Sequence, residues 1–153
     1  AQASVWEETA GELSQAALRH LWDEGQGFFV SGAERQVSWA SQVWFALAGV
    51  LDQEGNVRLL ERLMAENPAI PMVTPYMYHY FIDALMENGL QDQALEAMKS
   101  YWGGMVRAGA DTFWELYDPK DPYASPYGSR AINSFCHAWS GTPAYFIRKY
   151  FQD

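Results

Sequence analysis

The chain has 153 residues, 49% hydrophobic and 19% charged, which is enough to bury the core of one folded domain. Its 10 Lys and Arg residues are outnumbered by 19 Asp and Glu residues. The resulting formal net charge of -9 disfavours binding to nucleic acid or to an anionic membrane surface. Aromatic residues make up 16% of the chain. We expect some of these rings to line a site, because aromatic rings suit the flat apolar faces of sugars.

The first residues carry no sign of a secretory leader or of a membrane span. The opening AQASVWEETAGELSQAALRH has no basic stretch followed by an apolar run, and no segment approaches about 18 uninterrupted apolar residues. Because the chain also lacks an initiator Met, we expect it to begin within a longer protein. Its single cysteine, Cys136, excludes an intrachain disulfide and is expected to be a small buried apolar residue.

Two helices are predicted in the first third of the chain. Apolar residues recur every four positions within residues 5–22, which is typical of an amphipathic helix. Ser38 suits the N-cap of a second helix that is predicted to run to Leu51. That helix is apolar nearly all round, so we expect it to be buried on most sides.

Three further helices are predicted from the residues at their ends. They cover residues 56–66, 74–88 and 91–107. Thr74 is an N-cap followed by a proline at the first helical position, and an Asn-Gly pair closes the same helix. The connections are short, so neighbouring helices should form antiparallel hairpins.

The last third begins with a long loop. Residues 110–128 hold three prolines and five aromatic rings, and a loop of this length is usually functional or disordered. The rings argue against disorder. A final helix is predicted from Ser129 to about Trp139 and, after an interruption, on to Phe151. The fold class predicted from these elements is all-α, either a compact bundle or half of a larger two-layer helical barrel.

Glu115 is the first candidate for chemistry, because this carboxylate lies between Trp114 and Leu116 at the start of the loop. Aromatic neighbours lower the local polarity and should raise the pKa of the carboxyl group, which suits a general acid or base. Trp114 could stack against a sugar. The structural alternative is a glutamate that caps or forms a salt bridge on an ordered loop.

Other candidate residues each have a structural alternative. On the predicted final helix, Asn133 and His137 are four residues apart, and His137 could bond to a sugar hydroxyl or to a core carbonyl. Tyr76 and His79 could form an aromatic wall for a ligand or simply pack their helix. Gln42, inside an apolar helix, could face a cavity or be hydrogen-bonded within the fold.

Metal and cofactor binding are not indicated. The three histidines do not have the spacing of a zinc site, and there is no cysteine pair. The chain also has no glycine-rich phosphate loop and no Gly-x-Ser-x-Gly nucleophile turn. We therefore expect no metal and no cofactor.

Taken in order, these segments resemble the C-terminal half of the catalytic domain of bacterial α-L-rhamnosidases, glycoside hydrolase family 78. The most specific element is Gly-Ala-x-Thr-x-Trp-Glu at residues 109–115. The resemblance covers most of the chain. Its other parts are the helix at residues 13–22, the Ser41-Gln42 helix start, the Thr74 helix opening and the His-bearing segment at residues 133–139.

The resemblance implies an (α/α)6 barrel and inverting hydrolysis of a terminal α-L-rhamnosyl bond. It implies that Glu115 is the general base, that His137 contacts a hydroxyl of the sugar, and that Trp114 forms part of the adjacent wall. The family's general acid lies upstream of the matched region. The inverting mechanism needs a second carboxyl group about 6.5–9.5 Å from the base.

The chain, residues 1–153, is therefore expected to be the C-terminal portion of such a catalytic domain and to be inactive by itself. Its expected partners are a rhamnoside or related carbohydrate and either the missing half of the barrel or a second copy of itself, because a half barrel exposes apolar faces. Two other functions remain open. The first is a helical module that binds carbohydrate without catalysis, and the second is a helical-hairpin scaffold.

Overall fold

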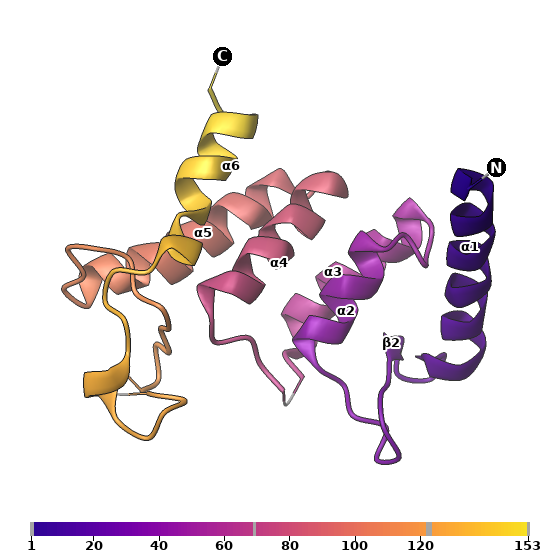
Figure 1. The fold of residues 1–153 in the computed structure, drawn as a ribbon, viewed down its shortest axis with the longest axis horizontal. Helices are drawn as coiled ribbons and strands as arrows, with labels where there is room; N and C mark the ends of the chain where they lie inside the picture. Colours follow the sequence, from indigo (N-terminus) through magenta and orange to yellow (C-terminus); the bar gives the residue numbers. More distant parts are fainter. Residues whose placement is uncertain (1, 69, 122–123, 153) are drawn as a thin grey trace. The chain divides into compact units, whose positions relative to one another are not determined.

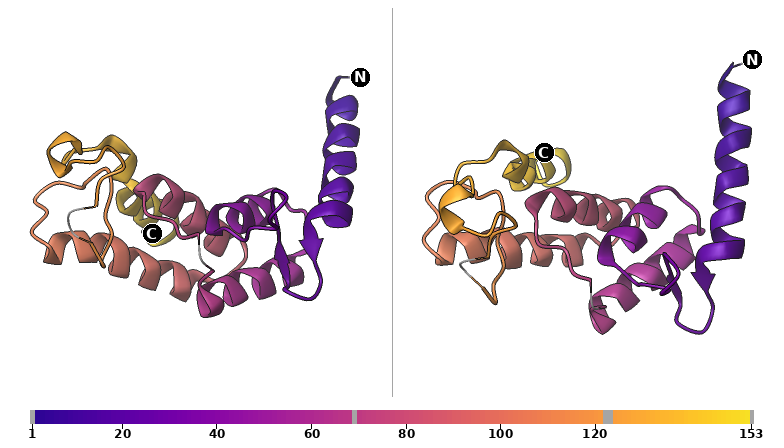
Figure 2. Two further views of the ribbon diagram at one scale, coloured as in Figure 1. Left: turned by 90° about the horizontal axis from the view of Figure 1, so that it is seen from below. Right: turned by 60° about the horizontal axis from the view of Figure 1, so that its bottom comes forward.

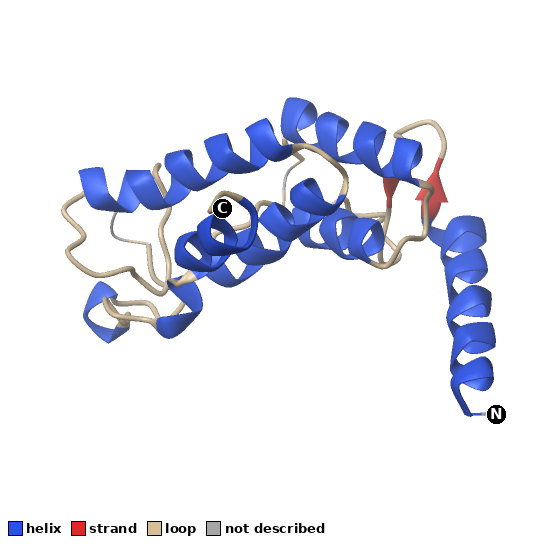
Figure 3. Cartoon of the chain, turned by 90° about the horizontal axis from the view of Figure 1, so that it is seen from above, coloured by secondary structure: helices blue, strands red, loops and turns tan. Residues whose placement is uncertain are grey.

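The computed structural model describes residues 2–68, 70–121 and 124–152. The chain divides into two compact units, Ala1–Pro71 and Met72–Asp153. Within the described residues the structure is mainly helical, and the exception is one antiparallel pair of two-residue strands (Figure 3). The all-α prediction is therefore confirmed.

The first unit contains three helices and the strand pair (Figure 1). Helix α1 (Gln2–Leu21) leads directly into β1 (Trp22–Asp23), which pairs with β2 (Phe28–Phe29), as Figure 2 shows. Helices α2 (Trp39–Leu47) and α3 (Gln53–Glu66) then pack against each other. Their contact forms the core of this unit, where Val43, Leu59, Leu60 and Leu63 are almost fully buried.

Helix α1 lies close to the helix predicted at residues 5–22, but its apolar side chains are not buried. None of its residues is buried, and the exposed fractions of Val5, Trp6 and Leu13 are 57%, 65% and 66%. These three residues lie near one side of the helix, since Leu13 follows Val5 by eight residues and Trp6 by seven, about two helical turns. Exposed apolar side chains of this kind are expected where a surface pairs with another part of a larger protein or with a second copy. The self-association expected above stays a prediction.

Helix α2 begins as predicted and ends earlier than predicted. The Ser38 hydroxyl accepts a hydrogen bond from the Ser41 backbone N–H over 3.2 Å, which is the N-cap contact expected of a serine. The helix ends at Leu47, and Gly49 follows with a φ of +63°, a conformation that glycine adopts without strain. The expected burial on most sides is confirmed, because Trp44, with 42% of its surface exposed, is the one residue of α2 that is neither buried nor half-buried.

The second unit is built on the hairpin of α4 (Pro75–Glu87) and α5 (Gln91–Arg107), which lie side by side in Figure 1. Their predicted limits are confirmed at both ends of α5 and at the Thr74 N-cap of α4. The two helices are joined through ring contacts, among them a stacked pair of Tyr78 and Tyr101 with centroids 3.8 Å apart. Helix α6 (Thr142–Tyr150) completes the unit.

The prediction of a helix from Ser129 to Trp139 was wrong. Two short 3-10 turns, Arg130–Ile132 and Ala138–Ser140, stand at its ends, and the residues between them form a non-helical loop. The reason is that backbone N–H groups of this segment bind partners outside it instead of carbonyls within a helix. The Ser134 N–H is bound by the Glu115 carboxylate and the His137 N–H by the Phe113 carbonyl, so neither is available to a helix.

Cys136 also departs from expectation, because it is exposed rather than buried. It belongs to the loop between the two 3-10 turns. Among the residues described, no helix is both long enough and apolar enough to cross a bilayer.

Candidate active site

Glu115 is held where two loop segments are joined by backbone hydrogen bonds. The Glu115 N–H donates to the Ser134 carbonyl over 2.9 Å, and the His137 N–H donates to the Phe113 carbonyl over 3.0 Å. The chain around Phe113 therefore runs antiparallel to the chain around His137. This pairing brings together two motifs that are about 20 residues apart in the sequence.

Two donors hold the carboxylate of Glu115. The Tyr127 hydroxyl donates to Oε1 over 2.5 Å, and the Ser134 N–H donates to Oε2 over 2.9 Å. Only 8% of the residue is exposed. Each carboxylate oxygen has a second lone pair, so the group can still accept a proton or bind a water molecule.

The pKa of Glu115 is lowered from its usual value, and the expectation that aromatic neighbours raise it was wrong. The Tyr127 hydroxyl is the largest cause and the Ser134 N–H the next, because both bind the charged form. A smaller lowering comes from the nearby His137, and burial acts in the opposite direction. The net result is a carboxylate that is ionised at neutral pH and can act as a base.

An aromatic wall lies beside Glu115, formed by His137, Trp139 and Tyr76. The Trp139 indole N–H donates to the Glu115 carbonyl over 3.1 Å, and the His137 ring stacks on Trp139 with centroids 4.2 Å apart. The ring centroid of Tyr76, at the start of α4, lies 5.9 Å from the ring centroid of Trp139. Tyr76 and Trp139 are 43% and 37% exposed, so their rings are accessible to a ligand.

Sequence reasoning singled out Glu115, His137 and Tyr76, and the structure brings them to one region. It missed Trp139 and Tyr127, which contact Glu115 directly. Trp139 lies in the 3-10 turn Ala138–Ser140, which His137 caps, and the two rings stack on each other. In the continuous helix that was predicted, residues two apart do not face each other, so this contact was not expected.

His79 has the contacts of a packing residue. Its Nδ1 is 3.1 Å from the Thr142 hydroxyl, and its ring lies 5.0 Å from Phe146 and 5.5 Å from Tyr145. Burial lowers the pKa of His79, which favours the neutral ring. These contacts join α4 to α6 and favour the structural alternative for this residue.

Gln42 belongs to the first unit and is fully buried there. Its Oε1 accepts from the Phe29 N–H over 2.8 Å, and its Nε2 donates to the carbonyls of Phe29 and Ser38 over 2.8 and 3.1 Å. The side chain therefore fastens β2 to the start of α2. These bonds favour the structural alternative for Gln42 as well.

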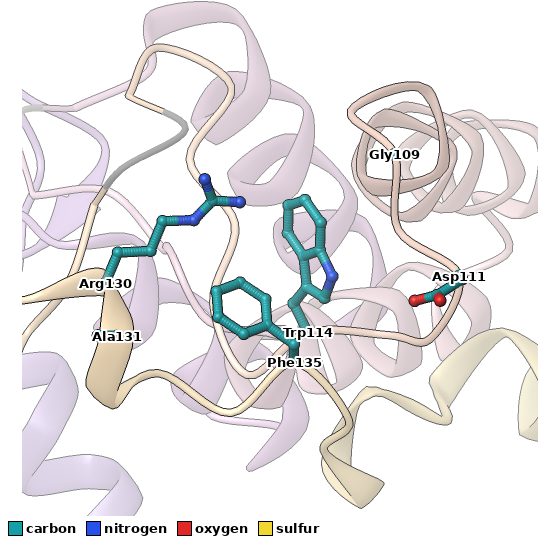
Figure 4. Close-up of a pocket in the computed structure, with 6 residues that line it drawn as sticks. All are labelled: Gly109, Asp111, Trp114, Arg130, Ala131 and Phe135. Atoms are coloured by element: carbon teal, nitrogen blue, oxygen red, sulfur yellow. The ribbon is translucent and has the colours of Figure 1, made fainter.

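Trp114 lies next to Glu115 in the chain but opens onto a different space. Figure 4 shows its indole in a pocket of about 450 Å³, together with Asp111, Arg130 and Phe135. Neither the residues that hold the Glu115 carboxylate nor the aromatic wall lines this pocket. Trp114 is thus placed beside the candidate base without facing the aromatic wall.

Among the described residues, no group of three or more His, Cys, Asp or Glu side chains is arranged to hold a metal ion. The groups that the structure gathers at the site are a hydrogen-bonded carboxylate, a histidine and exposed rings.

Replacing Tyr127 with phenylalanine should raise the pKa of Glu115, because it removes the largest stabilising contact of the charged form. If ionised Glu115 is needed for turnover, the acidic limb of kcat/KM lies below about pH 4.5 in the parent protein and moves upward in Tyr127→Phe. A pH–rate profile of both proteins measures this shift of the acidic limb. The lowered pKa of Glu115 also stabilises the folded state above pH 4.5, and this contribution is lost as pH falls through the folded-state pKa. Tyr150→Phe, a tyrosine change away from Glu115, should leave the limb in place.

Comparison with known proteins agrees with this architecture. The family described as the bacterial alpha-L-rhamnosidase 6 hairpin glycosidase domain matches residues 1–151, nearly the whole chain. The chain belongs to this family of six-hairpin glycosidase domains. A search of curated proteins found no match.

Two solved structures of rhamnosidases are similar to the chain. One is a rhamnosidase from Klebsiella oxytoca with rhamnose bound, with 52% identity, a TM-score of 0.96, and coverage of 99% of this chain. The other is a GH78 rhamnosidase of Bacillus sp. GL1, with 28% identity, a TM-score of 0.71 and coverage of 89%. The chain spans 29% and 15% of the lengths of those two proteins. The resemblance to family 78 rhamnosidases is thereby confirmed, and so is the assignment to a glycoside hydrolase domain.

Proposed function

We propose that this chain supplies the base half of an inverting α-L-rhamnosidase site, with Glu115 as the general base. The observation that supports it best is the ionised, two-donor carboxylate of Glu115 beside the aromatic wall of His137, Trp139 and Tyr76. A sugar ring stacked on that wall would present its anomeric carbon near a carboxylate. A base of this kind is what activation of water requires.

In the proposed reaction, Glu115 removes a proton from a water molecule while the water oxygen bonds to the anomeric carbon. The glycosidic C–O bond breaks on the opposite face of the sugar, and a second carboxyl group protonates the departing oxygen. Tyr127 and Ser134 hold the Glu115 carboxylate in one orientation throughout. His137 contacts a hydroxyl of the bound sugar and fixes the distance to the base.

The second carboxyl group is proposed to lie in the whole protein outside these 153 residues. Asp111, Asp118 and Asp121 are the carboxylates closest to Glu115 in the sequence, and none of them matches the acid's motif. An inverting site also needs about 6.5–9.5 Å between its two carboxyl groups, to leave room for the water molecule. We therefore propose that this chain is inactive by itself and that catalysis requires the whole protein.

The stereochemistry of hydrolysis tests the proposal. The whole protein, given an aryl α-L-rhamnoside, should release β-L-rhamnose first, and proton NMR taken within minutes would detect it before mutarotation. An initial α-anomer would exclude inversion and with it the role of Glu115 as base. Binding of the rhamnoside without hydrolysis would favour the non-catalytic carbohydrate-binding module.

Replacing His137 with alanine should weaken rhamnoside binding about fivefold, since one hydrogen bond to a sugar hydroxyl is worth about 1 kcal/mol. The change should appear mainly in KM or in the Kd for L-rhamnose, measured by calorimetry. His20→Ala, which changes an exposed histidine of α1, is the matched control and should leave the Kd unchanged. A wild-type Kd in His137→Ala would remove this residue from the sugar site.

A further inference from the structure

Asn133 closes the loop that carries Tyr127. Its Nδ2 donates to the Ala124 carbonyl over 2.9 Å, and its Oδ1 accepts from the Ser125 hydroxyl over 2.7 Å. Asn133 and both of its partners are half-buried, and the two bonds join the ends of the loop at residues 124–133. The proposed reaction gives no part to the Asn133 side chain.

Tyr127 stands at the tip of this loop, in a turn that begins at Ser125. The Gly128 N–H donates to the Ser125 carbonyl over 3.4 Å, and the Tyr127 N–H donates to the Ser125 hydroxyl over 3.2 Å. Gly128 has a φ of +78°, which glycine adopts without strain. Because 52% of Tyr127 is exposed, packing restrains it little. The direction of its ring therefore depends on the hydrogen bonds of the loop.

Both donors to the Glu115 carboxylate are connected to Asn133. The Tyr127 hydroxyl, which binds Oε1 over 2.5 Å, belongs to the loop that the Asn133 side chain closes. The Ser134 N–H, which binds Oε2 over 2.9 Å, belongs to the peptide group that follows Asn133. One residue thus fixes the positions of the two donors relative to each other.

We propose that Asn133 is a positioning residue, whose side chain holds the Tyr127 hydroxyl against the Glu115 carboxylate. A hydroxyl that donates to a carboxylate stabilises its charged form and restricts its orientation. Both effects suit a base that must be ionised and directed at a water molecule. Without the Asn133 amide, the turn at residues 125–128 keeps its own hydrogen bonds but loses the two that close the loop.

The effect of Asn133 on turnover rests on the proposed function, in which Glu115 is the base. Its effect on the ionisation of the Glu115 carboxyl group does not depend on that role. The two effects are therefore measured separately, so that failure of one can be told from failure of the other.

The test compares Asn133→Ala, Tyr127→Phe and the double variant in the whole protein. Carbon-13 NMR of protein labelled at the glutamate carboxyl carbons follows the pKa of Glu115, and Glu115→Gln identifies the resonance by its absence. Tyr127 and His137 are the titratable groups in the described part of the chain that shift this pKa, and Asn133→Ala changes neither.

Asn133→Ala should raise the pKa of Glu115 and lower kcat about tenfold, with KM changed little. In the Tyr127→Phe background the same substitution should change kcat by less than about twofold, because the contact through which Asn133 acts is already absent. The pKa of Glu115 in the double variant should likewise stay close to its value in Tyr127→Phe.

Ser125→Ala tests the same loop if Asn133→Ala does not fold. It removes the hydroxyl that binds Asn133, so the pKa and kcat should move in the same directions, whereas Ser125→Thr keeps a hydroxyl and should recover most of the loss. Asn67→Ala is the matched control. It removes an asparagine that accepts a hydrogen bond from Trp39 in the first unit, and both quantities should stay at their parent values.

The proposal is overturned if the pKa of Glu115 stays at its parent value in Asn133→Ala or, where that variant does not fold, in Ser125→Ala. It is also overturned if Asn133→Ala has as large an effect in the Tyr127→Phe background as in the parent protein, since that would indicate a general loss of structure. A raised pKa in Asn133→Ala together with full turnover by Glu115→Gln would uphold the positioning role and contradict only the proposed function.

Discussion

Replacing Glu115 with glutamine should lower the kcat of the whole protein on an α-L-rhamnoside by about 10³-fold, within the 10²–10⁴-fold that general-base catalysis contributes. Glutamine has nearly the same shape, and its amide oxygen can still accept one of the two hydrogen bonds, from the Tyr127 hydroxyl or from the Ser134 N–H. It cannot take a proton from water. The loss should therefore appear in kcat, with KM changed little.

The matched control for this change is Glu96→Gln, the same substitution at an exposed position of α5. Circular dichroism and thermal midpoints within about 4 °C of the parent for both variants would show that folding is retained. If Glu115→Gln turned over substrate at the rate of Glu96→Gln, another residue would have to be the base.

Replacing Gln42 with alanine should destabilise the fold by about 3–5 kcal/mol, the second large effect that we expect. The change leaves both the N–H and the carbonyl of Phe29 without their partner in a fully buried position. It also opens a cavity between β2 and α2. Urea unfolding of the chain, followed by tryptophan fluorescence, measures the loss.

Two further variants separate packing from sugar contact at this position. Gln42→Leu keeps the volume but not the hydrogen bonds, so it should recover only the cavity part of the loss. Gln15→Ala, an exposed glutamine in α1, should change stability by less than about 0.5 kcal/mol. A Gln42→Ala protein with parent stability and weakened rhamnose binding would restore Gln42 to the sugar site.

The helices of the fold were predictable where local signals act alone. Ser38 and Thr74 cap their helices through the side-chain bonds that their residue types favour, and the α5 limits follow from its flanking residues. The segment after residue 128 was not predictable in this way. Its backbone partners come from residues 113–115, and a non-local pairing leaves no periodic pattern in either segment.

The site was predictable in its residues more than in its electrostatics. Glu115 and His137 stand out by motif, but the direction of the pKa shift of Glu115 depends on Tyr127 and the Ser134 N–H. Neither donor is adjacent to Glu115 in the sequence. Its aromatic neighbours therefore predicted a pKa shift in the wrong direction. Gln42 and His79 were also candidates, but their polar groups are hydrogen-bonded within the fold, Gln42 to Phe29 and His79 to Thr142. The sequence does not show these partners.

The central claim, that Glu115 activates the attacking water, is tested most directly by chemical rescue of Glu115→Ala with azide. Azide attacks without needing a base and can occupy the space that the carboxylate leaves. We predict that azide restores turnover of an aryl α-L-rhamnoside and yields β-L-rhamnosyl azide, the product of attack from the face of Glu115. Hydrolysis by Glu115→Ala at the parent rate without azide, or formation of the α-azide, would contradict the claim.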